Sequence, residues 1–224
     1  MKASAPLLRF VAEGIGTFAL VFAAAGSVMV EELSDGMISS IGVALSPGLV
    51  VMAMVYAVGH ISGAHINPAV TFGFALTRNF PWREVPVYWC AQLSGAILAV
   101  GVLRIMLGLV AGMGGNTPSG SAVQSLGMEI VLTFFLMFVV TAVSTNQDRV
   151  GSFSGMAIGS VVVLGILLGG PISGGSMNPA RSFGPAFVGL IWADHWVYWV
   201  GPLLGATLGA STYLGLDRMR IRDQ

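Results

Sequence analysis

The chain has 224 residues, of which 55% are hydrophobic and only 9% are charged, whereas a soluble domain carries roughly 25% charged residues. This composition indicates a membrane protein. The ten acidic and ten basic residues balance, so no positive excess points to nucleic acid, and the single Cys90 allows neither an internal disulfide nor a thiolate metal cluster.

Six runs without Asp, Glu, Lys or Arg are close to or above the roughly 17–25 residues that a helix needs to cross the hydrocarbon core. We therefore predict six membrane spans. The runs cover residues 14–30, 36–59, 85–103, 130–147, 150–180 and 195–216.

The basic residues predict the orientation of the spans. A cytoplasmic N-terminus places most of the positive charge on the cytoplasmic side, as the positive-inside rule requires. We therefore expect both termini in the cytoplasm and the chain in a plasma or inner membrane. The basic residues on that side are Lys2, Arg9, Arg78, Arg83, Arg149, Arg218, Arg220 and Arg222, and the acidic residues outside are Glu31, Glu32, Asp35 and Asp194.

The chain contains an internal repeat. Residues 61–73 (ISGAHINPAVTFG) and 172–184 (ISGGSMNPARSFG) share Ile, Ser, Gly, Asn, Pro, Ala, Phe and Gly in one frame. Each half then holds three spans, an odd number, so the second half must enter the membrane upside down. We predict two inverted repeats, residues 1–110 and 111–224.

Each repeat carries an Asn-Pro-Ala box between its second and third spans. Pro at the first helical position presets φ and loses no hydrogen bond, so Asn67 and Asn178 are predicted N-caps. The boxes open short half-helices at 67–77 and 178–188, neither of which is long enough to span. The extended backbone before each box is tolerated at membrane depth only where it is buried in protein or lines a path.

Paired boxes, the repeated Glu-x-x-x-Thr at Glu13 and Glu129, and Ser-Gly-Ala-His at 62–65 resemble the aquaporin and glycerol-facilitator family over essentially the whole chain. The chain is most similar to the nodulin-like branch and its bacterial relatives. The resemblance implies an all-α membrane fold with six transmembrane helices and two re-entrant half-helices. It also implies a passive channel for water and small uncharged solutes such as glycerol, urea, and boric or arsenous acid, assembled as a homotetramer.

The expected pore centre is formed by the amides of Asn67 and Asn178, next to the positive ends of both half-helices. Carbonyls of the loops are expected to replace part of a solute's hydration shell. Those carbonyls belong to Gly63, Ala64, His65, Gly174, Ser176 and Met177. The family frame gives an apolar wall of Leu20, Val51, Leu136 and Val162, for which ordinary helix packing stays open.

A guanidinium inside the membrane is costly unless it faces water or partners, and Arg181 resembles the family's selectivity-filter arginine. Counting from the boxes, the other filter positions are Pro47, Ile166 and Gly175. Water-selective members place an aromatic residue and a His at the first two positions, so we expect a wider opening here. The alternative is a strictly water-selective channel, because other positions favour it, namely Ser182, Ala186, Tyr198 and Trp199.

The remaining polar residues admit other readings. Glu13 and Glu129 are either proton relays or, as the resemblance implies, acceptors for the loop backbones. A secondary transporter is a distant alternative, because it usually carries midplane carboxylates where this chain has Asn. An enzyme is not expected, since neither Ser62 nor Ser176 has a catalytic triad with His65. His60 and His65 have no third ligand nearby, so we predict no metal site and no cofactor.

Overall fold

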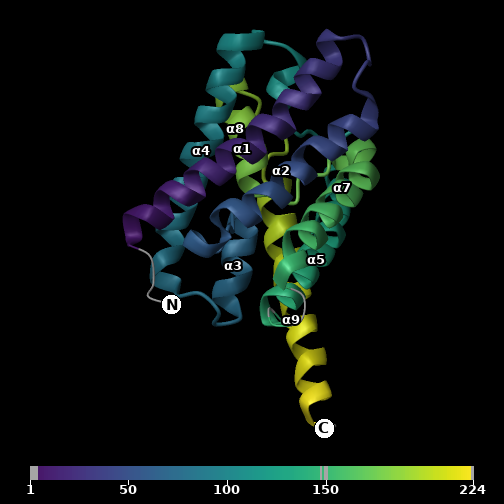
Figure 1. Cartoon of the computed structure of the whole chain (residues 1–224). Coiled ribbons are helices and arrows are strands. Elements are labelled where there is room, and N and C mark those ends of the chain that lie inside the picture. Colours follow the sequence, from purple (N-terminus) through teal and green to yellow (C-terminus); the bar gives the residue numbers. More distant parts are fainter. Residues whose placement is uncertain (1–4, 147, 149–150, 223–224) are drawn as a thin grey trace.

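The computed structural model describes residues 5–146, 148 and 151–222, and this part of the chain is helical without a strand (Figure 1). Six helices are long: α1 (Pro6–Leu33), α2 (Ser39–Ser62), α4 (Val85–Leu107), α5 (Ala122–Thr145), α7 (Ser154–Ser173) and α9 (Val197–Arg222). Two are short, α3 (Pro68–Leu76) and α8 (Pro179–Gly189), and three 3-10 turns complete the set: η1 (Trp82–Glu84), η2 (Ala111–Gly114) and η3 (Gly151–Phe153).

Five segments of the described chain are both long and apolar enough to cross a membrane: Pro6–Leu33, Ser39–Ser62, Trp82–Leu107, Ala122–Thr145 and Gly151–Ser173. The sixth predicted run corresponds to α9. This helix is 26 residues long, which is sufficient to span, but its composition is less apolar. In Figure 1, the C-terminal end of α9 projects beyond the other helices.

The long helices pack in matched pairs, α1 with α4 and α5 with α9, while α2 packs on α7. Small residues allow the paired backbones to approach closely. A Cβ at Gly95 of α4 would collide with the carbonyl of Gly14 in α1, and a Cβ at Gly205 of α9 would collide with the carbonyl of Ile130 in α5. Such close contacts are typical of membrane helices, whose association depends on backbone packing.

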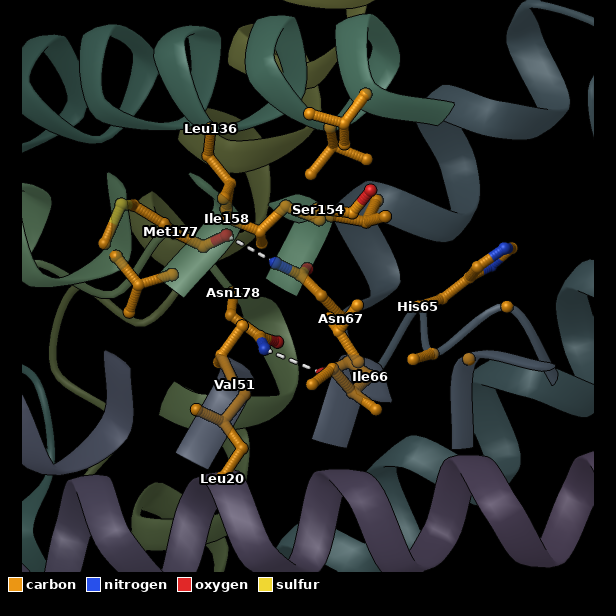
Figure 2. A pocket seen from close by; sticks show the side chains of 18 of the residues that line it. Leu20, Val51, His65, Ile66, Asn67, Leu136, Ser154, Ile158, Met177 and Asn178 are labelled. Carbon is orange, nitrogen blue, oxygen red and sulfur yellow. Dashed lines mark hydrogen bonds between the residues drawn. The ribbon is translucent and has the colours of Figure 1, made fainter. Parts of the chain in front are cut away.

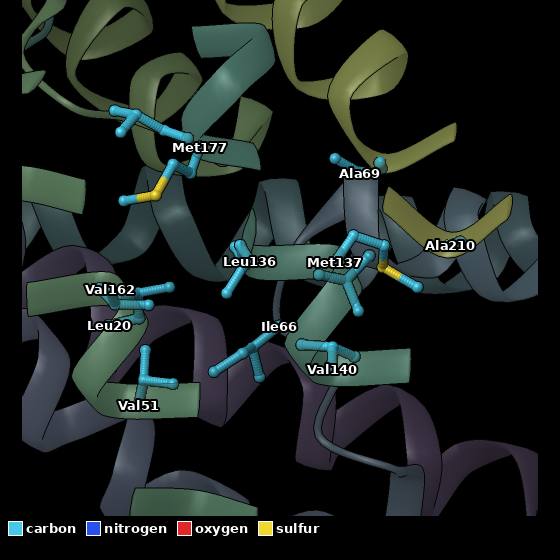
Figure 3. Packing of buried hydrophobic residues seen from close by; sticks show 13 residues of the cluster. Leu20, Val51, Ile66, Ala69, Leu136, Met137, Val140, Val162, Met177 and Ala210 are labelled. Atoms are coloured by element: carbon cyan, nitrogen blue, oxygen red, sulfur yellow. The ribbon is translucent and has the colours of Figure 1, made fainter. Parts of the chain in front are cut away.

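The main apolar cluster joins residues from both halves of the chain (Figure 3). It brings side chains of the long helices together with Ile66 and Met177, the residues just before the two boxes. Leu20, Val51, Leu136, Val162 and Ala210 represent α1, α2, α5, α7 and α9 in it. The cluster therefore fixes the two loops against long helices of both halves.

The two short helices begin at the boxes. Asn67 has an extended backbone (φ −158°), and its side chain accepts a hydrogen bond from the N–H of Ala69 at 2.8 Å. Asn178 caps α8 in the same way by accepting from Ala180 at 3.0 Å. α3 ends at Leu76, one residue before the expected end, and α8 ends at Gly189, one residue after it. Both helices are too short to span a membrane.

Candidate functional site

The two Asn side chains connect the halves of the molecule. Nδ2 of Asn67 donates to the carbonyl of Met177 at 2.8 Å, and Nδ2 of Asn178 donates to the carbonyl of Ile66 at 3.0 Å (Figure 2). Each amide nitrogen carries two hydrogens, and each amide oxygen is already used as a helix cap. One N–H of each Asn is therefore available for other partners.

Both Asn residues line a cavity of about 650 Å³ and are only 4% exposed. The positive ends of α3 and α8 lie at the same place, because Asn67 and Asn178 cap these helices. The centre of the cavity therefore presents hydrogen-bond donors and positive potential. A molecule that accepts hydrogen bonds fits there, whereas a cation does not.

The loops before the boxes have a backbone that L-residues rarely adopt. Ile66 has φ 43° and Met177 has φ 53°, both in the left-handed region. Such conformations persist only where the surroundings determine them. Two buried carboxylates do so here, one from α1 and one from α5.

Glu13 accepts from the backbone N–H groups of His65 at 2.9 Å and Ile66 at 2.7 Å. Glu129 accepts in the same way from Ser176 at 2.8 Å and Met177 at 2.7 Å. With the amides turned toward the carboxylates, the loops are fixed with their carbonyls available to the cavity.

The supports of the two loops match in further detail. Ser62 and Ser173 each donate a hydroxyl to the nearby carboxylate at 2.7 Å. Tyr88 donates to the carbonyl of Ser62 at 2.7 Å, and Tyr198 donates to that of Ser173 at 2.8 Å. The first carboxylate also accepts from a side-chain amide, because Gln92 donates to Glu13 at 2.7 Å. The two loops thus share these equivalent contacts and differ in others.

Most of the predicted carbonyl residues line the larger cavity, namely Gly63, Ala64, His65, Ser176 and Met177. Gly174 lines a second cavity of about 370 Å³, and its carbonyl accepts from Nδ2 of Asn116 at 3.0 Å. The Met177 carbonyl is engaged by Asn67, and the equivalent carbonyl of Ile66, which was not predicted, is engaged by Asn178. These two carbonyls therefore accept hydrogen bonds from the central Asn side chains in addition to lying beside the cavity.

The two cavities meet at four shared residues, Ala24, Pro47, Ile166 and Arg181. Gly175 lines the larger cavity beside them. The four predicted filter positions are therefore brought together, although Pro47 was counted along a helix with a proline inside it. Ala24 was not predicted. It follows Leu20 by one helical turn on α1, and this spacing is the signal that places it on the same face.

Arg181 is 6% exposed and is held by carbonyls from two distant segments. Its Nη1 donates to Gly114 at 2.7 Å and its Nη2 donates to Ala24 at 3.3 Å. Gly114 lies in η2 with φ 65°, and a Cβ there would collide with Ala25. The η2 segment thus positions the guanidinium.

This geometry agrees with the comparisons with known proteins. The chain matches the Major intrinsic protein family over residues 1–213. It belongs to the major intrinsic protein family. Aquaporin NIP1-1 of Oryza sativa subsp. japonica is 52% identical over 206 residues, which cover 92% of this chain and 72% of the relative. Nodulin-26 of Glycine max is 48% identical over 212 residues, covering 94% and 78%.

A solved structure gives the same result. The X-ray structure of the aquaglyceroporin from Plasmodium falciparum superposes with a TM-score of 0.75 and 27% identity, covering 93% of this chain and 94% of that chain. The aquaporin fold is therefore confirmed, and the chain is a multi-pass membrane channel for water and small neutral solutes. Proteins of this family are channels and not enzymes.

In this major intrinsic protein, the four predicted wall residues both pack in the apolar cluster and line a cavity. Leu20, Val51, Leu136 and Val162 are 4–8% exposed and pack in the main apolar cluster. The same side chains line the larger cavity. These apolar side chains offer few hydrogen bonds to the cavity, whose centre carries the Asn amides.

Two polar side chains that bond to irregular segments were missed. Asn116 bridges the η2 side to the second loop: it donates to Gly174 and accepts from the hydroxyl of Ser182 at 2.9 Å. The larger cavity also ends in a polar mouth that includes Tyr56, whose hydroxyl donates to the carbonyl of Ser152 at 3.0 Å. No periodic pattern points to these loop contacts.

The ring of His65 is surrounded by aromatic side chains, with ring centroids 4.8–5.0 Å from Phe74, Phe80 and Tyr88. Its Nδ1 lies 3.2 Å from the hydroxyl of Thr71. These contacts brace the first loop. Among the described residues, no group of three or more His, Cys, Asp or Glu side chains comes together as a metal site.

Proposed function

We propose that the neutral solutes of this channel include glycerol, urea, and boric and arsenous acids, and that ions and protons are excluded. The observation that carries the proposal is the lining of the junction between the two cavities. Pro47 and Ile166 contribute apolar surface there, and Gly175 beside them has no side chain. A filter of Pro47, Ile166, Gly175 and Arg181 leaves room for a solute larger than water.

Arg181 supplies the polar side of this filter. Two of its nitrogens are bound to carbonyls, and the guanidinium has further N–H groups for a solute oxygen. A triol or a trihydroxy acid accepts from Arg181 and places its other face on Ile166. Carbonyls of Gly63, Ala64, His65, Gly174, Ser176 and Met177 offer acceptors along the path.

Ion and proton exclusion is attributed to the centre. A water that accepts from both Asn67 and Asn178 directs its own hydrogens away from the centre, so a proton is not relayed through it. Cations meet the positive ends of α3 and α8. Glu13 and Glu129 are proposed as loop supports, because their oxygens are engaged by backbone amides and hydroxyls and are unlike the free carboxylates of a proton relay.

The arrangement in the membrane is also proposed. We infer inverted repeats at 1–110 and 111–224, which is supported by the equivalent contacts of Glu13 and Glu129. The distribution of basic residues supports cytoplasmic termini in a plasma or inner membrane. A homotetramer with one pore per subunit is proposed from family membership.

A stopped-flow panel in proteoliposomes tests the solute range. Water, glycerol, urea, boric acid and arsenous acid are each measured against protein-free vesicles of the same lipid, and all are expected to permeate. If water alone passes, the strictly water-selective alternative is correct. Uptake against a gradient, driven by a coupled ion, would instead support the secondary transporter.

A further inference from the structure

The smaller cavity, of about 370 Å³, lies beyond the filter and is lined by few polar side chains. We call it the vestibule. Its described lining contains two charged residues, Arg181 from α8 and Glu31 from near the end of α1. Apolar side chains and glycines make up most of the rest, including Val28, Val43 and Leu167.

One oxygen of the Glu31 carboxylate lacks a partner among the described residues. Within the part of the chain that the structure describes, the carboxylate takes part in no ion pair, and its Oε2 is buried without a hydrogen-bond partner. The contrast with Glu13 and Glu129 is clear, because both of those carboxylates are engaged by several donors. A buried acceptor without a donor is unfavourable, so Glu31 favours any molecule that brings one.

The two charged groups have opposite hydrogen-bonding capacity. A carboxylate only accepts, whereas a guanidinium only donates. A hydroxyl group does both, so a molecule with several hydroxyls donates to Glu31 and accepts from Arg181. An anion lacks the donor that Glu31 needs and is repelled by its charge, whereas a cation is repelled by Arg181.

We propose that Glu31 and Arg181 make the vestibule a binding site for neutral polyhydroxylated molecules, which collects them before they enter the filter. The proposal rests on the proposed function, since it assigns to Glu31 a part in choosing the solutes of the same pore. It makes Glu31 a specificity-determining residue in addition to the four filter positions.

Binding is tested without permeation. Purified full-length protein in lipid nanodiscs is titrated with glycerol and followed by saturation-transfer NMR. The variant Glu31→Leu removes the acceptor, and we expect the dissociation constant to rise about tenfold, as for the loss of a hydrogen bond to a charged group. Glu31→Gln keeps one acceptor oxygen, so its dissociation constant should lie between those of the parent protein and Glu31→Leu. The matched control is Glu32→Gln, because Glu32 is exposed and lines neither cavity.

Permeation is then measured on the same variants by stopped flow. Permeability to glycerol and boric acid, relative to that for water, is expected to fall in Glu31→Leu and to remain as in the parent protein in Glu32→Gln. If the parent binds glycerol through Glu31 but does not conduct it, the vestibule site stands and the proposed solute range is wrong. If Glu31→Leu binds glycerol as the parent does, or if the parent binds none, the inference about Glu31 is overturned.

Discussion

Arg181 donates to the carbonyl of Gly114 at 2.7 Å, although 67 residues separate them in the chain. This contact ties the arginine at the junction of the two cavities to η2, a turn that lies between α4 and α5. The position of the guanidinium is therefore set by a loop outside both boxes.

Arg181→Ala should raise ion leak. The substitution removes the fixed positive charge at the junction of the two cavities and widens it, while the path for neutral solutes persists. Current across planar bilayers is the measurement, with Arg104→Ala as the control, because Arg104 is exposed on α4 and lines neither cavity. Unchanged current together with an unchanged solute cut-off would make Arg181 a structural residue.

Pro47→Phe combined with Ile166→His should narrow the filter. Glycerol and boric acid permeability is expected to fall at least tenfold, a barrier increase of ~1.4 kcal/mol, while water permeability changes less. Stopped-flow light scattering on proteoliposomes gives all three rates. If the double variant passes both solutes as the parent does, Pro47 or Ile166 does not restrict the opening.

Ala24→Leu should reduce the glycerol rate as well, because Ala24 is the fourth residue shared by both cavities. Ala23→Leu is the matched control, since Ala23 is the neighbouring residue on the same helix and lines neither cavity. The two variants are compared in the same proteoliposome assay. Equal glycerol rates for the two variants would show that Ala24 does not line the constriction.

Asn67→Asp should impair both folding and water flux. A carboxylate cannot donate to the Met177 carbonyl, and an unsatisfied buried acceptor costs about 1–3 kcal/mol. Thermal unfolding in detergent and stopped-flow water permeability report the two effects. Asn79→Asp serves as the control because Asn79 is exposed. Water conduction at the parental rate by the double variant Asn67→Asp with Asn178→Asp would contradict the central-donor mechanism.

Glu129→Gln should lower the unfolding temperature. The Gln side chain has only one acceptor oxygen, whereas Glu129 accepts from Ser176 and Met177 through different oxygens. One backbone N–H is left without a partner, at a cost of about 1–3 kcal/mol. Differential scanning calorimetry in detergent measures the shift against Glu32→Gln. An unfolding temperature equal to that of the parent would exclude Glu129 as a support of the loop.

The sequence predicted the parts of the structure that depend on local rules. An Asn followed by a Pro specifies a helix start, so α3 and α8 begin where expected. Positions along α2 and α7 can also be counted from the boxes, because the rise and rotation per residue of a helix are fixed. For this reason counting from the boxes selected Pro47 and Ile166, which both line the junction of the two cavities.

The contacts made by irregular segments could not be predicted in this way. Gly114 and Asn116 lie outside the long helices, where no period relates a residue to its neighbours in space. Their partners, Arg181 and Gly174, are distant in the chain. Only the packing of complete helices brings these groups together. The unpartnered Oε2 of Glu31 likewise becomes visible only when the contacts of the folded chain are known.

The crossed hydrogen bonds of the two Asn residues have a consequence for biosynthesis. The carbonyl of Ile66 receives its donor from Asn178, which is made 112 residues later. Until that residue has entered the bilayer, the first re-entrant loop lacks one of its ties. The first half alone therefore cannot complete the pore centre, which forms only after the second box has been synthesised and inserted.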